Sequence, residues 1–420
     1  MTQVTLFDRI RCVNRAMAYV SASFAAHHWQ VAYTAVELAR LVGLPPTHIC
    51  RLATAALLHD LGEMVLPETV ENVIYDTDLA DRRSPLGADV LRHYTPFWEA
   101  EPLVRHLHHF PESTEGLPDW SEMDLTLLHI LQISEYVAAQ WTDRGDLAFA
   151  KLVRQCLEQP ELRDVGAQIR AAFRVLGAKE AYWYGMRDGH VLQDGRLEGV
   201  EWPVIFASRE DNAAFLKVLS VLLYWWSPHS GYHAFGTGAI ATALAEAMGL
   251  DPVISSDLRS AAWGMDMGHL KVDRGLLLRP GKLKAEELIA MQAHVYYSVQ
   301  LLQGQVHADC LSLIAYHHEH LNGSGYPYRV SNATLTTTHQ ILIMANILAA
   351  VLEERPYRGP LDPAECEAAL SALAGSVVSE DLVEMAVAQF STLQVRHGTA
   401  VQEGRAWYDA FTLKTAWTRN

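Results

Sequence analysis

An internal duplication is the feature that most constrains the fold of this 420-residue sequence. Three residues of the first half follow one another at intervals of 16: His27, Gly43 and His59. The same two intervals recur 206 residues later, at His233, Gly249 and Met265. A chain that repeats its landmarks at fixed spacing is expected to repeat a structural unit as well.

A second match lies further along each half. The segment HHFPESTEGLP (108–118) aligns with HHEHLNGSGYP (317–327) at an offset of 209 residues, and the histidine pair and the closing Gly-x-Pro keep their register. Two matches at nearly equal offsets predict a duplicated domain. We therefore expect an N-terminal domain over 1–180, a linker over 181–205 and a C-terminal domain over 206–420, a division that suits a chain of this length.

Apolar residues recur at helical spacing through most of the sequence. VAYTAVELARLVGL, AIATALAEAMGL and HQILIMANILAAVLEE are three examples, and Gly-Leu-Pro or Gly-Leu-Asp-Pro ends the first two. This pattern predicts an all-α fold built as two tandem helical bundles. The segment 182–206 differs, because glycines and Asp-Gly pairs separate short β-type runs, and it predicts a small β-hairpin in the linker.

Bulk composition narrows the classes of function. Hydrophobic residues make up 50% and charged residues 20% of the chain, as in an ordinary globular protein. The formal net charge of −16 opposes binding to polymeric nucleic acid or to an anionic membrane, although a local basic pocket can still hold a phosphorylated small molecule. The five cysteines are scattered, and no signal peptide or transmembrane segment is visible, so we expect a cytoplasmic protein with reduced thiols.

His59 and Asp60 stand side by side at the end of an apolar helical run, in LLHDLGE. Adjacent helical side chains point about 100° apart, so this pair can serve one centre only if another helix adds ligands. His27 lies on another predicted helix and can face the pair. Imidazole and carboxylate donors with open positions suit a divalent ion such as Fe, Mn or Zn, which would acidify a water for phosphoester hydrolysis.

The second half carries the motifs of a known family. It reads MDMGHLKVDRGLLLRPGKLKAEELIAMQAHVYYSVQLL, then HHEHLNGSGYP, then RPYR. In this ordered set the chain resembles the HD-GYP branch of the HD metal-dependent phosphohydrolase superfamily, over nearly its whole length and in two copies. The resemblance implies hydrolysis of cyclic dinucleotides, mainly cyclic di-GMP and in some members cyclic GMP-AMP, at a site of two or three metals.

The resemblance implies a set of metal ligands in the second copy: His229, His233, Asp266, His294, His317 and His318. Two positions depart from the family pattern, because Met265 replaces the histidine of the HD pair and Asn346 replaces the final aspartate. A thioether or an amide binds such an ion far more weakly than imidazole or carboxylate, so one metal position should be weakened. Substrate binding is implied for four residues, of which the first replaces the family's lysine: His269, Tyr326, Arg355 and Arg358.

The first copy departs from the family in the opposite sense. Its implied metal ligands are His27, His59, Asp60, His108, His109 and Glu135. The ligands of the first metal are all present in type, but the middle histidine of the second metal aligns near Arg83, whose guanidinium can replace a cation only electrostatically. Leu117 replaces the family's tyrosine, and Glu63 replaces its lysine with a group that repels phosphate. This copy is expected to hold metal better than substrate.

The leading interpretation is a cytoplasmic cyclic-dinucleotide signalling protein on a metal-dependent phosphodiesterase framework, with weak turnover. In the mechanism implied by the resemblance, a metal-activated water attacks a phosphodiester in line. The implied catalytic residues are Asp60 and Asp266, which would hold the metals. Fe or Mn is favoured as the metal, with Zn as the alternative.

Three alternatives remain open. A receptor or scaffold would bind a nucleotide, or a partner such as a diguanylate cyclase, without cleaving anything. A mononuclear phosphohydrolase in the first copy would act on a small nucleotide. His317 and His318 would otherwise be polar core residues that hold helices together through hydrogen bonds. In each case the two copies are expected to pack on each other or to form a homodimer.

Overall fold

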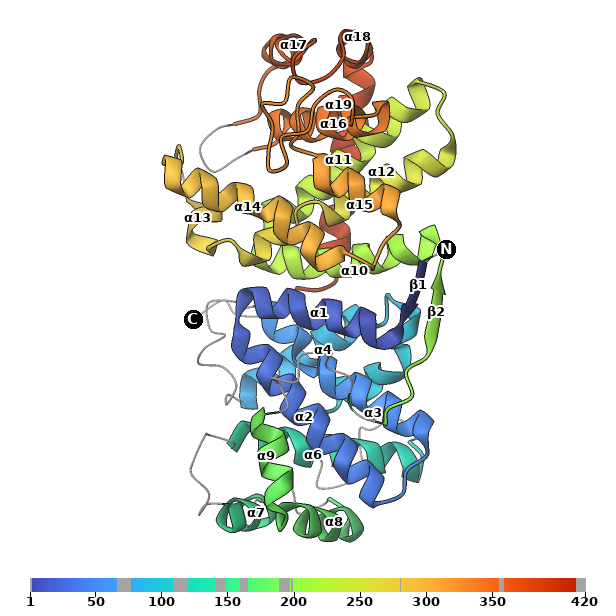
Figure 1. Cartoon of the computed structure of the whole chain (residues 1–420), viewed down its shortest axis with the longest axis vertical. Helices are drawn as coiled ribbons and strands as arrows, with labels where there is room; N and C mark the ends of the chain where they lie inside the picture. Colours follow the sequence, from blue (N-terminus) through green and yellow to red (C-terminus); the bar gives the residue numbers. More distant parts are fainter. Residues whose placement is uncertain are drawn as a thin grey trace, which may run out of the picture. The chain divides into compact units, whose positions relative to one another are not determined.

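The computed structural model describes residues 2–65, 77–108, 120–140, 149–158, 165–188, 197, 199–279, 281–354 and 359–412. Helices dominate these residues, and two short strands form the one sheet in this described part of the chain (Figure 1). The all-α fold class predicted from the sequence is therefore confirmed.

The first half of the chain starts with a strand and continues as helices. Its elements are β1 (Thr2–Thr5), α1 (Leu6–Val20), α2 (Ala22–Leu41), α3 (Pro46–Leu58), the 3₁₀ helix η1 (His59–Val65), α4 (Thr77–Leu91), η3 (Thr95–Ala100), α5 (Glu101–Arg105), α6 (Glu122–Gln140), α7 (Phe149–Glu158), α8 (Ala167–Gly177) and α9 (Glu180–Asp188).

The second half again starts with a strand. Its elements are β2 (Val204–Ala207), α10 (Arg209–Trp226), α11 (Pro228–Ala247), α12 (Pro252–Gly264), η6 (Met267–Lys271), α13 (Arg274–Leu278), α14 (Ala285–Leu302), α15 (Ala308–Tyr316), α16 (Thr337–Leu352), α17 (Pro363–Ser371), α18 (Glu380–Ala388) and α19 (Phe390–Asp409). The described chain divides into two compact units. We call Thr5–Ile205 the N-terminal unit, and Phe206–Thr412 with Met1–Val4 the C-terminal unit.

The helices that follow each strand repeat one another. The bounds of α11 and α12 lie 206 residues after those of α2 and α3. Gly43 and Gly249 end the first helix of each pair with φ of 76° and 67°, and the next residue, Leu44 or Leu250, donates its N–H back to the helix. Glycine adopts this left-handed conformation without steric cost, so both units use the same turn to enter the second helix.

The linker differs from the expected β-hairpin. Residues 182–188 belong to α9, where Tyr182, Trp183 and Met186 recur at helical spacing and are buried together. The strand that follows, β2, pairs with β1 at the start of the chain and not with a neighbouring segment. Residues 189–196 and 198 lie outside the described part. Residues 182–188 therefore form a helix because it buries their apolar face, although the glycines and aspartates of this segment suggested a turn.

Each unit presses a helix tightly against the turn that carries its aspartate. A Cβ added at Gly62 in η1 would lie 1.9 Å from the carbonyl oxygen of Arg83 in α4. A Cβ added at Gly268 in η6 would lie 1.9 Å from the carbonyl oxygen of His294 in α14. Gly62 and Gly268 lie 206 residues apart and make the same contact, so Arg83 and His294 occupy equivalent backbone positions in the two units.

Among the described residues, no helix has both the length and the apolar character that a membrane span requires.

Candidate metal centres

A shared turn positions Asp60 and Asp266. α3 gives way to His59, with φ −62° and ψ −36°, and α12 gives way to Met265, with φ −61° and ψ −36°. Both His59 and Met265 are buried. Met265 therefore occupies the backbone position of His59, and the substitution removes a ligand without altering the turn.

The N-terminal centre gathers four side chains: His27 from α2, His59 and Asp60 from η1, and Glu135 from α6. His59 Nε2 lies 2.9 Å from Glu135 Oε2 and 3.1 Å from Asp60 Oδ2. His27 Nε2 lies 3.1 Å and 3.5 Å from the same two oxygens. Donor atoms about 2.1 Å from a common ion stand about 3.0–3.4 Å apart, so each carboxylate oxygen lies close to the separation from the two imidazoles that a shared divalent cation requires.

Hydrogen bonding orients His59 as a ligand. Its Nδ1 lies 2.8 Å from the carbonyl oxygen of Ala56, which only accepts, so Nδ1 donates and Nε2 faces the carboxylates. Burial by itself would lower the pKa of His59, but Asp60 and Glu135 raise it well above its usual value. Burial would raise the pKa of Asp60, but His59 and its other imidazole neighbours hold it well below its usual value. Without metal, the carboxylates of Asp60 and Glu135 stabilise the protonated form of His59. A bound divalent cation can supply that positive charge in place of the proton.

Arg83 stands where the C-terminal unit has His294. Its side chain is buried, and Nη1 donates to Oε2 of Glu63. Burial and repulsion from Asp60 raise the pKa of Glu63 to about 7, although Arg83 opposes the shift. A guanidinium offers donors and no lone pair for a metal, so the N-terminal centre suits one cation and not two.

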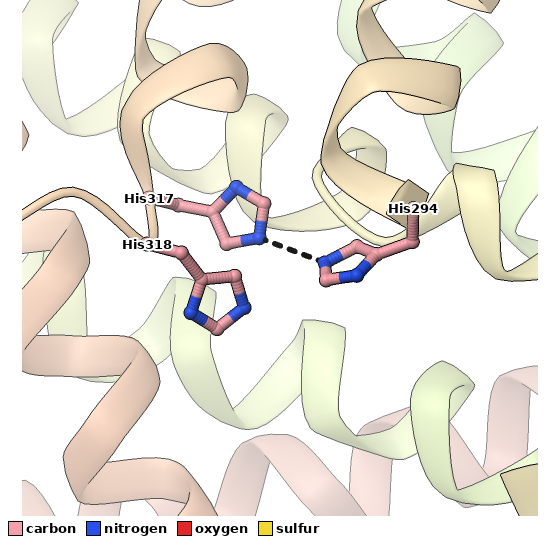
Figure 2. A group of neighbouring side chains, drawn as sticks. All are labelled: His294, His317 and His318. Atoms are coloured by element: carbon pink, nitrogen blue, oxygen red, sulfur yellow. Dashed lines mark hydrogen bonds between the residues drawn. The ribbon is translucent and has the colours of Figure 1, made fainter. Parts of the chain in front are cut away.

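The C-terminal centre is built from Asp266 at the start of η6, His294 in α14 and His317 directly after α15. His294 Nε2 lies 3.3 Å from Asp266 Oδ1 and 3.3 Å from His317 Nε2, and the Asp266 and His317 atoms lie 3.8 Å apart. Figure 2 shows His317 and His318 leaving the same segment with their rings turned toward His294. One carboxylate and two imidazoles at these separations fit a divalent cation.

The tautomers of this trio also point to a cation. Nδ1 of His294 lies 2.7 Å from the Met291 carbonyl oxygen, and Nδ1 of His317 lies 2.7 Å from the Ile314 carbonyl oxygen. Both Nδ1 atoms therefore donate, and neutral rings leave two Nε2 lone pairs facing each other across the contact marked in Figure 2. Burial and the neighbouring His294 lower the pKa of His317 to about 4, so a cation and not a proton is the partner expected near neutral pH.

Two further imidazoles flank the trio. His269 offers a ring nitrogen within 4.8 Å of the ligand atoms of Asp266 and His294, and His318 does so for His294 and His317. Ser230 Oγ lies 3.2 Å from His269 Nδ1. Burial and the neighbouring His294 lower the pKa of His269 to about 3. The C-terminal centre is thus rich in neutral imidazole, where the N-terminal centre is rich in carboxylate.

His233 is engaged outside this centre. Its Nε2 lies 2.6 Å from Asn346 Oδ1, and its Nδ1 lies 3.0 Å from Glu353 Oε2. In the N-terminal unit the corresponding residues, His27 and Glu135, face each other as a ligand pair. The amide of Asn346 has turned that pair into a hydrogen-bond network, which occupies both nitrogens of His233.

A pocket of about 540 Å³ opens beside the C-terminal centre. Asp266, His269, His294 and His318 line it, and so do Arg279, Lys282, Tyr326, His229 and His233. Arg279 donates to both oxygens of Glu287, whereas Lys282 forms no ion pair within the described ranges. A concave site of this size with one uncommitted cation suits an anionic small molecule.

A buried carboxylate anchors the loop after the histidine pair. Glu319 is 0% exposed, and its two oxygens accept the backbone N–H groups of Tyr328, Arg329 and Val330 at 2.7–3.1 Å. Tyr326 stacks on His318, with ring centroids 4.7 Å apart and an interplanar angle of 18°. The loop therefore holds one face of Tyr326 against the metal-side histidine and leaves the tyrosine on the pocket wall.

The site residues predicted from the sequence divide into three groups. Those brought together as ligand sets are His27, His59, Asp60 and Glu135 in one unit, and Asp266, His269, His294, His317 and His318 in the other. Those on the pocket wall away from these sets are His229, His233 and Tyr326. His109, Arg355 and Arg358 lie outside the described residues, and His108 joins no ligand set among the described ones.

Sequence reasoning did not single out three residues that the structure brings to these sites: His28, Lys282 and Glu353. His28 follows His27 directly, and Lys282 lies in the basic run RPGKLK, so both carried a visible signal. Glu353 carried none, because its role depends on the folded position of His233.

A helical bundle with a histidine–aspartate turn facing helical ligands defines an HD domain. This chain contains the arrangement once with His59 and Asp60, and once with Met265 in the place of the histidine before Asp266. Models of the HD domain match residues 24–140 and 217–379. The chain belongs to the HD metal-dependent phosphohydrolase superfamily, as two tandem degenerate copies of the HD-GYP type.

The chain is similar in sequence to known cyclic-dinucleotide phosphodiesterases. The chain is 24% identical over 386 residues to the 3′3′-cGAMP-specific phosphodiesterase 1 of Vibrio cholerae, covering 85% of each chain. It is 28% identical over 173 residues to a cyclic di-GMP phosphodiesterase of Thermotoga maritima, a match that covers 40% of this chain and 47% of the relative. The crystal structure of a V. cholerae cyclic GMP-AMP specific phosphodiesterase superposes with a TM-score of 0.57, at 16% identity and over 93% of this chain and 98% of that one, which shows a shared fold.

Proposed function

We propose that this chain is a cyclic-dinucleotide phosphodiesterase of low turnover, and that the C-terminal unit carries the reaction. The observation that carries the proposal is the convergence of Asp266, His294 and His317 on one ion-sized position beside a pocket of about 540 Å³. The names of the relatives support a cyclic dinucleotide as the substrate class.

The pocket provides contacts for such a substrate. Lys282 supplies an uncommitted ammonium for a phosphate, a task that His269 cannot perform while it is neutral. Tyr326 supplies an aromatic wall beside His318, on which a base can stack. Substrate positioning therefore falls to Lys282 and Tyr326, and metal binding to the imidazoles and Asp266.

A divalent cation bound in the C-terminal centre would supply Lewis acidity, which would neutralise phosphate charge and lower the pKa of a water. Asp266 and His294, which line the pocket, would hold the cation together with His317, which is buried and absent from the lining. Nitrogen and oxygen donors without thiolate suit Fe²⁺ or Mn²⁺, with Zn²⁺ as the alternative.

The test is product analysis with two substrates, cyclic di-GMP and 3′3′-cGAMP, after loading the protein with Mn²⁺ or Fe²⁺. The expected result is a linear dinucleotide that forms slowly and requires Asp266 and Lys282. Lys282→Gln should raise KM more than it lowers kcat, because Lys282 contacts substrate and not the cation. Lys284→Gln, two residues away in the same basic run and not on the pocket wall, is the matched control.

A receptor without turnover is the second candidate, and the engagement of His233 by Asn346 favours it. A centre that lacks one imidazole and one carboxylate can retain ligand affinity after its chemistry is lost. Calorimetry separates the two functions. Binding of a cyclic dinucleotide with no product in a single-turnover reaction would establish the receptor function. The bound receptor would then be expected to act on a partner protein such as a diguanylate cyclase.

A further inference from the structure

His28 is a buried ligand-type side chain that the HD pattern does not require. It lies in α2 beside His27, with 0% of its surface exposed. Its Nε2 lies 3.6 Å from Asp60 Oδ2, beyond hydrogen-bond distance, and has no hydrogen-bond partner in the described structure. A buried nitrogen without a partner is costly, so this atom needs an explanation.

The tautomer of His28 follows from its surroundings. The amide nitrogen of Asn14 donates to the carbonyl oxygens of Ile10 and Leu57, so Oδ1 of Asn14 is the atom that faces His28. That oxygen lies 2.6 Å from His28 Nδ1 and can only accept. Nδ1 therefore carries the proton, and Nε2 presents its lone pair toward Asp60 and the N-terminal centre.

The C-terminal unit has no such residue. The four other ligands of the N-terminal centre have counterparts 206 to 211 residues later, but the counterpart of His28 is Ala234. His28 also offers its nitrogen within 4.8 Å of the ligand atoms of His59 and Asp60. The additional donor thus distinguishes the N-terminal unit from its own duplicate.

We propose that His28 is a fifth protein ligand, which closes the N-terminal centre around a single cation and makes it a structural metal site. Structural sites are filled by protein donors, whereas catalytic sites keep a position for water or substrate. Arg83 supports the same conclusion, because it occupies the place from which a second cation would be bound. The proposal concerns metal binding and does not depend on hydrolysis in the C-terminal unit.

The experiment uses the full chain with Asp266→Ala and His317→Ala, so that Mn²⁺ binds only in the N-terminal unit. Water-proton relaxation then reports whether bound Mn²⁺ carries exchangeable water. We expect little enhancement in this background and a clear rise after His28→Ala, because removal of the ligand opens a coordination position. His48→Ala changes a histidine in the first turn of α3 that belongs to no ligand set; it is the matched control and should leave relaxation unchanged.

A second readout is the rate at which a chelator removes Mn²⁺. His28→Ala should speed release by about 10-fold or more, and Asn14→Ala should speed it less, because Asn14 only orients the ring.

Two results would overturn the proposal. One is an unchanged relaxation and release rate in His28→Ala that still folds, as judged by its circular dichroism. The other is a background protein that binds no Mn²⁺ at all, since a structural site must fill.

Discussion

The N-terminal and C-terminal units share one backbone arrangement and differ in what they place on it. The N-terminal centre combines two carboxylates with three imidazoles, and Arg83 pairs with Glu63 beside it. The C-terminal centre has one carboxylate among four imidazoles and lies beside a pocket. The turn conformation and the glycine contact are the same in both. Duplication therefore preserved the scaffold while ligand substitutions separated a closed centre from an open one.

The largest effect is expected from Asp266→Ala, which tests whether the C-terminal unit and not the N-terminal unit carries the reaction. Asp266→Ala should lower cyclic-dinucleotide turnover at least about 100-fold, because it removes the only carboxylate from the C-terminal ligand set. Product formation measured by chromatography checks this. Asp309→Ala, which removes an exposed carboxylate of the same unit, should behave as the parent does. Turnover that survives Asp266→Ala would move the reaction to the N-terminal unit.

The second prediction concerns pH in protein stripped of metal. Carboxylates raise the pKa of His59, so its contribution to stability is full below about pH 6.5 and is lost as pH rises through the raised value. Burial lowers the pKa of His317 to about 4, so its contribution is full above about pH 6.5 and is lost as pH falls toward 4. The shift of the His317 pKa, from 6.5 to about 4, corresponds to about 3 kcal/mol.

Hydrogen exchange resolved by peptide measures both units in one sample. After correction for the intrinsic rate, protection of α3 should decrease as pH rises above about 6.5, while protection of α14 should decrease as pH falls from about 6.5 toward 4. Saturation with Mn²⁺ should flatten the α3 profile, because the cation replaces the proton that His59 carries. Parallel profiles in the two units would contradict the opposite electrostatics of their centres.

The third prediction sharpens the comparison by making the C-terminal centre resemble its duplicate. Met265→His with Asn346→Asp restores the donor types found at His59 and Glu135. The double variant should bind about one more equivalent of metal and turn over about 10-fold faster. Elemental analysis and product formation check the two parts separately. A gain in metal without a gain in turnover would favour the receptor.

The smallest effect is expected at the loop that Glu319 anchors after the histidine pair of the C-terminal unit. Glu319 accepts three backbone N–H groups, and its register partner in the first copy is Phe110. Glu319→Gln replaces one acceptor oxygen by a donor and should cost about 1–2 kcal/mol of unfolding free energy. Thermal unfolding and the affinity for cyclic dinucleotide measure it. Glu286→Gln, on an exposed helix start of the same unit, is the control and should cost little.

Much of the fold was readable because it repeats. The offset of 206 residues between His27 and His233 predicted two matching helix pairs, and the positions of Gly43 and Gly249 predicted where the first helices end. The linker was misread because glycine and aspartate outweighed the buried face of α9 in a local reading. The local sequence pattern indicates which backbone conformations have a low free energy, and burial in the tertiary structure selects one of them.

Much of each ligand set was readable for a similar reason. His59, Asp60, His317 and His318 stand in motifs whose spacing fixes their place in the fold, and the structure gathers them. The role of His28 was not readable, although the residue was in plain view, because adjacency to His27 does not reveal which way its Nε2 points. That direction depends on Asn14, which two carbonyls hold in place.

The sequence by itself determined the duplication, the helical class and the type of metal chemistry, because these follow from spacing and from donor identity. Only the tertiary structure decided which centre is open. His233 became a hydrogen-bond partner and His28 became a candidate ligand through contacts with residues distant in the chain. Whether a donor binds metal depends on where its lone pair points, and side chains brought together by folding set that direction.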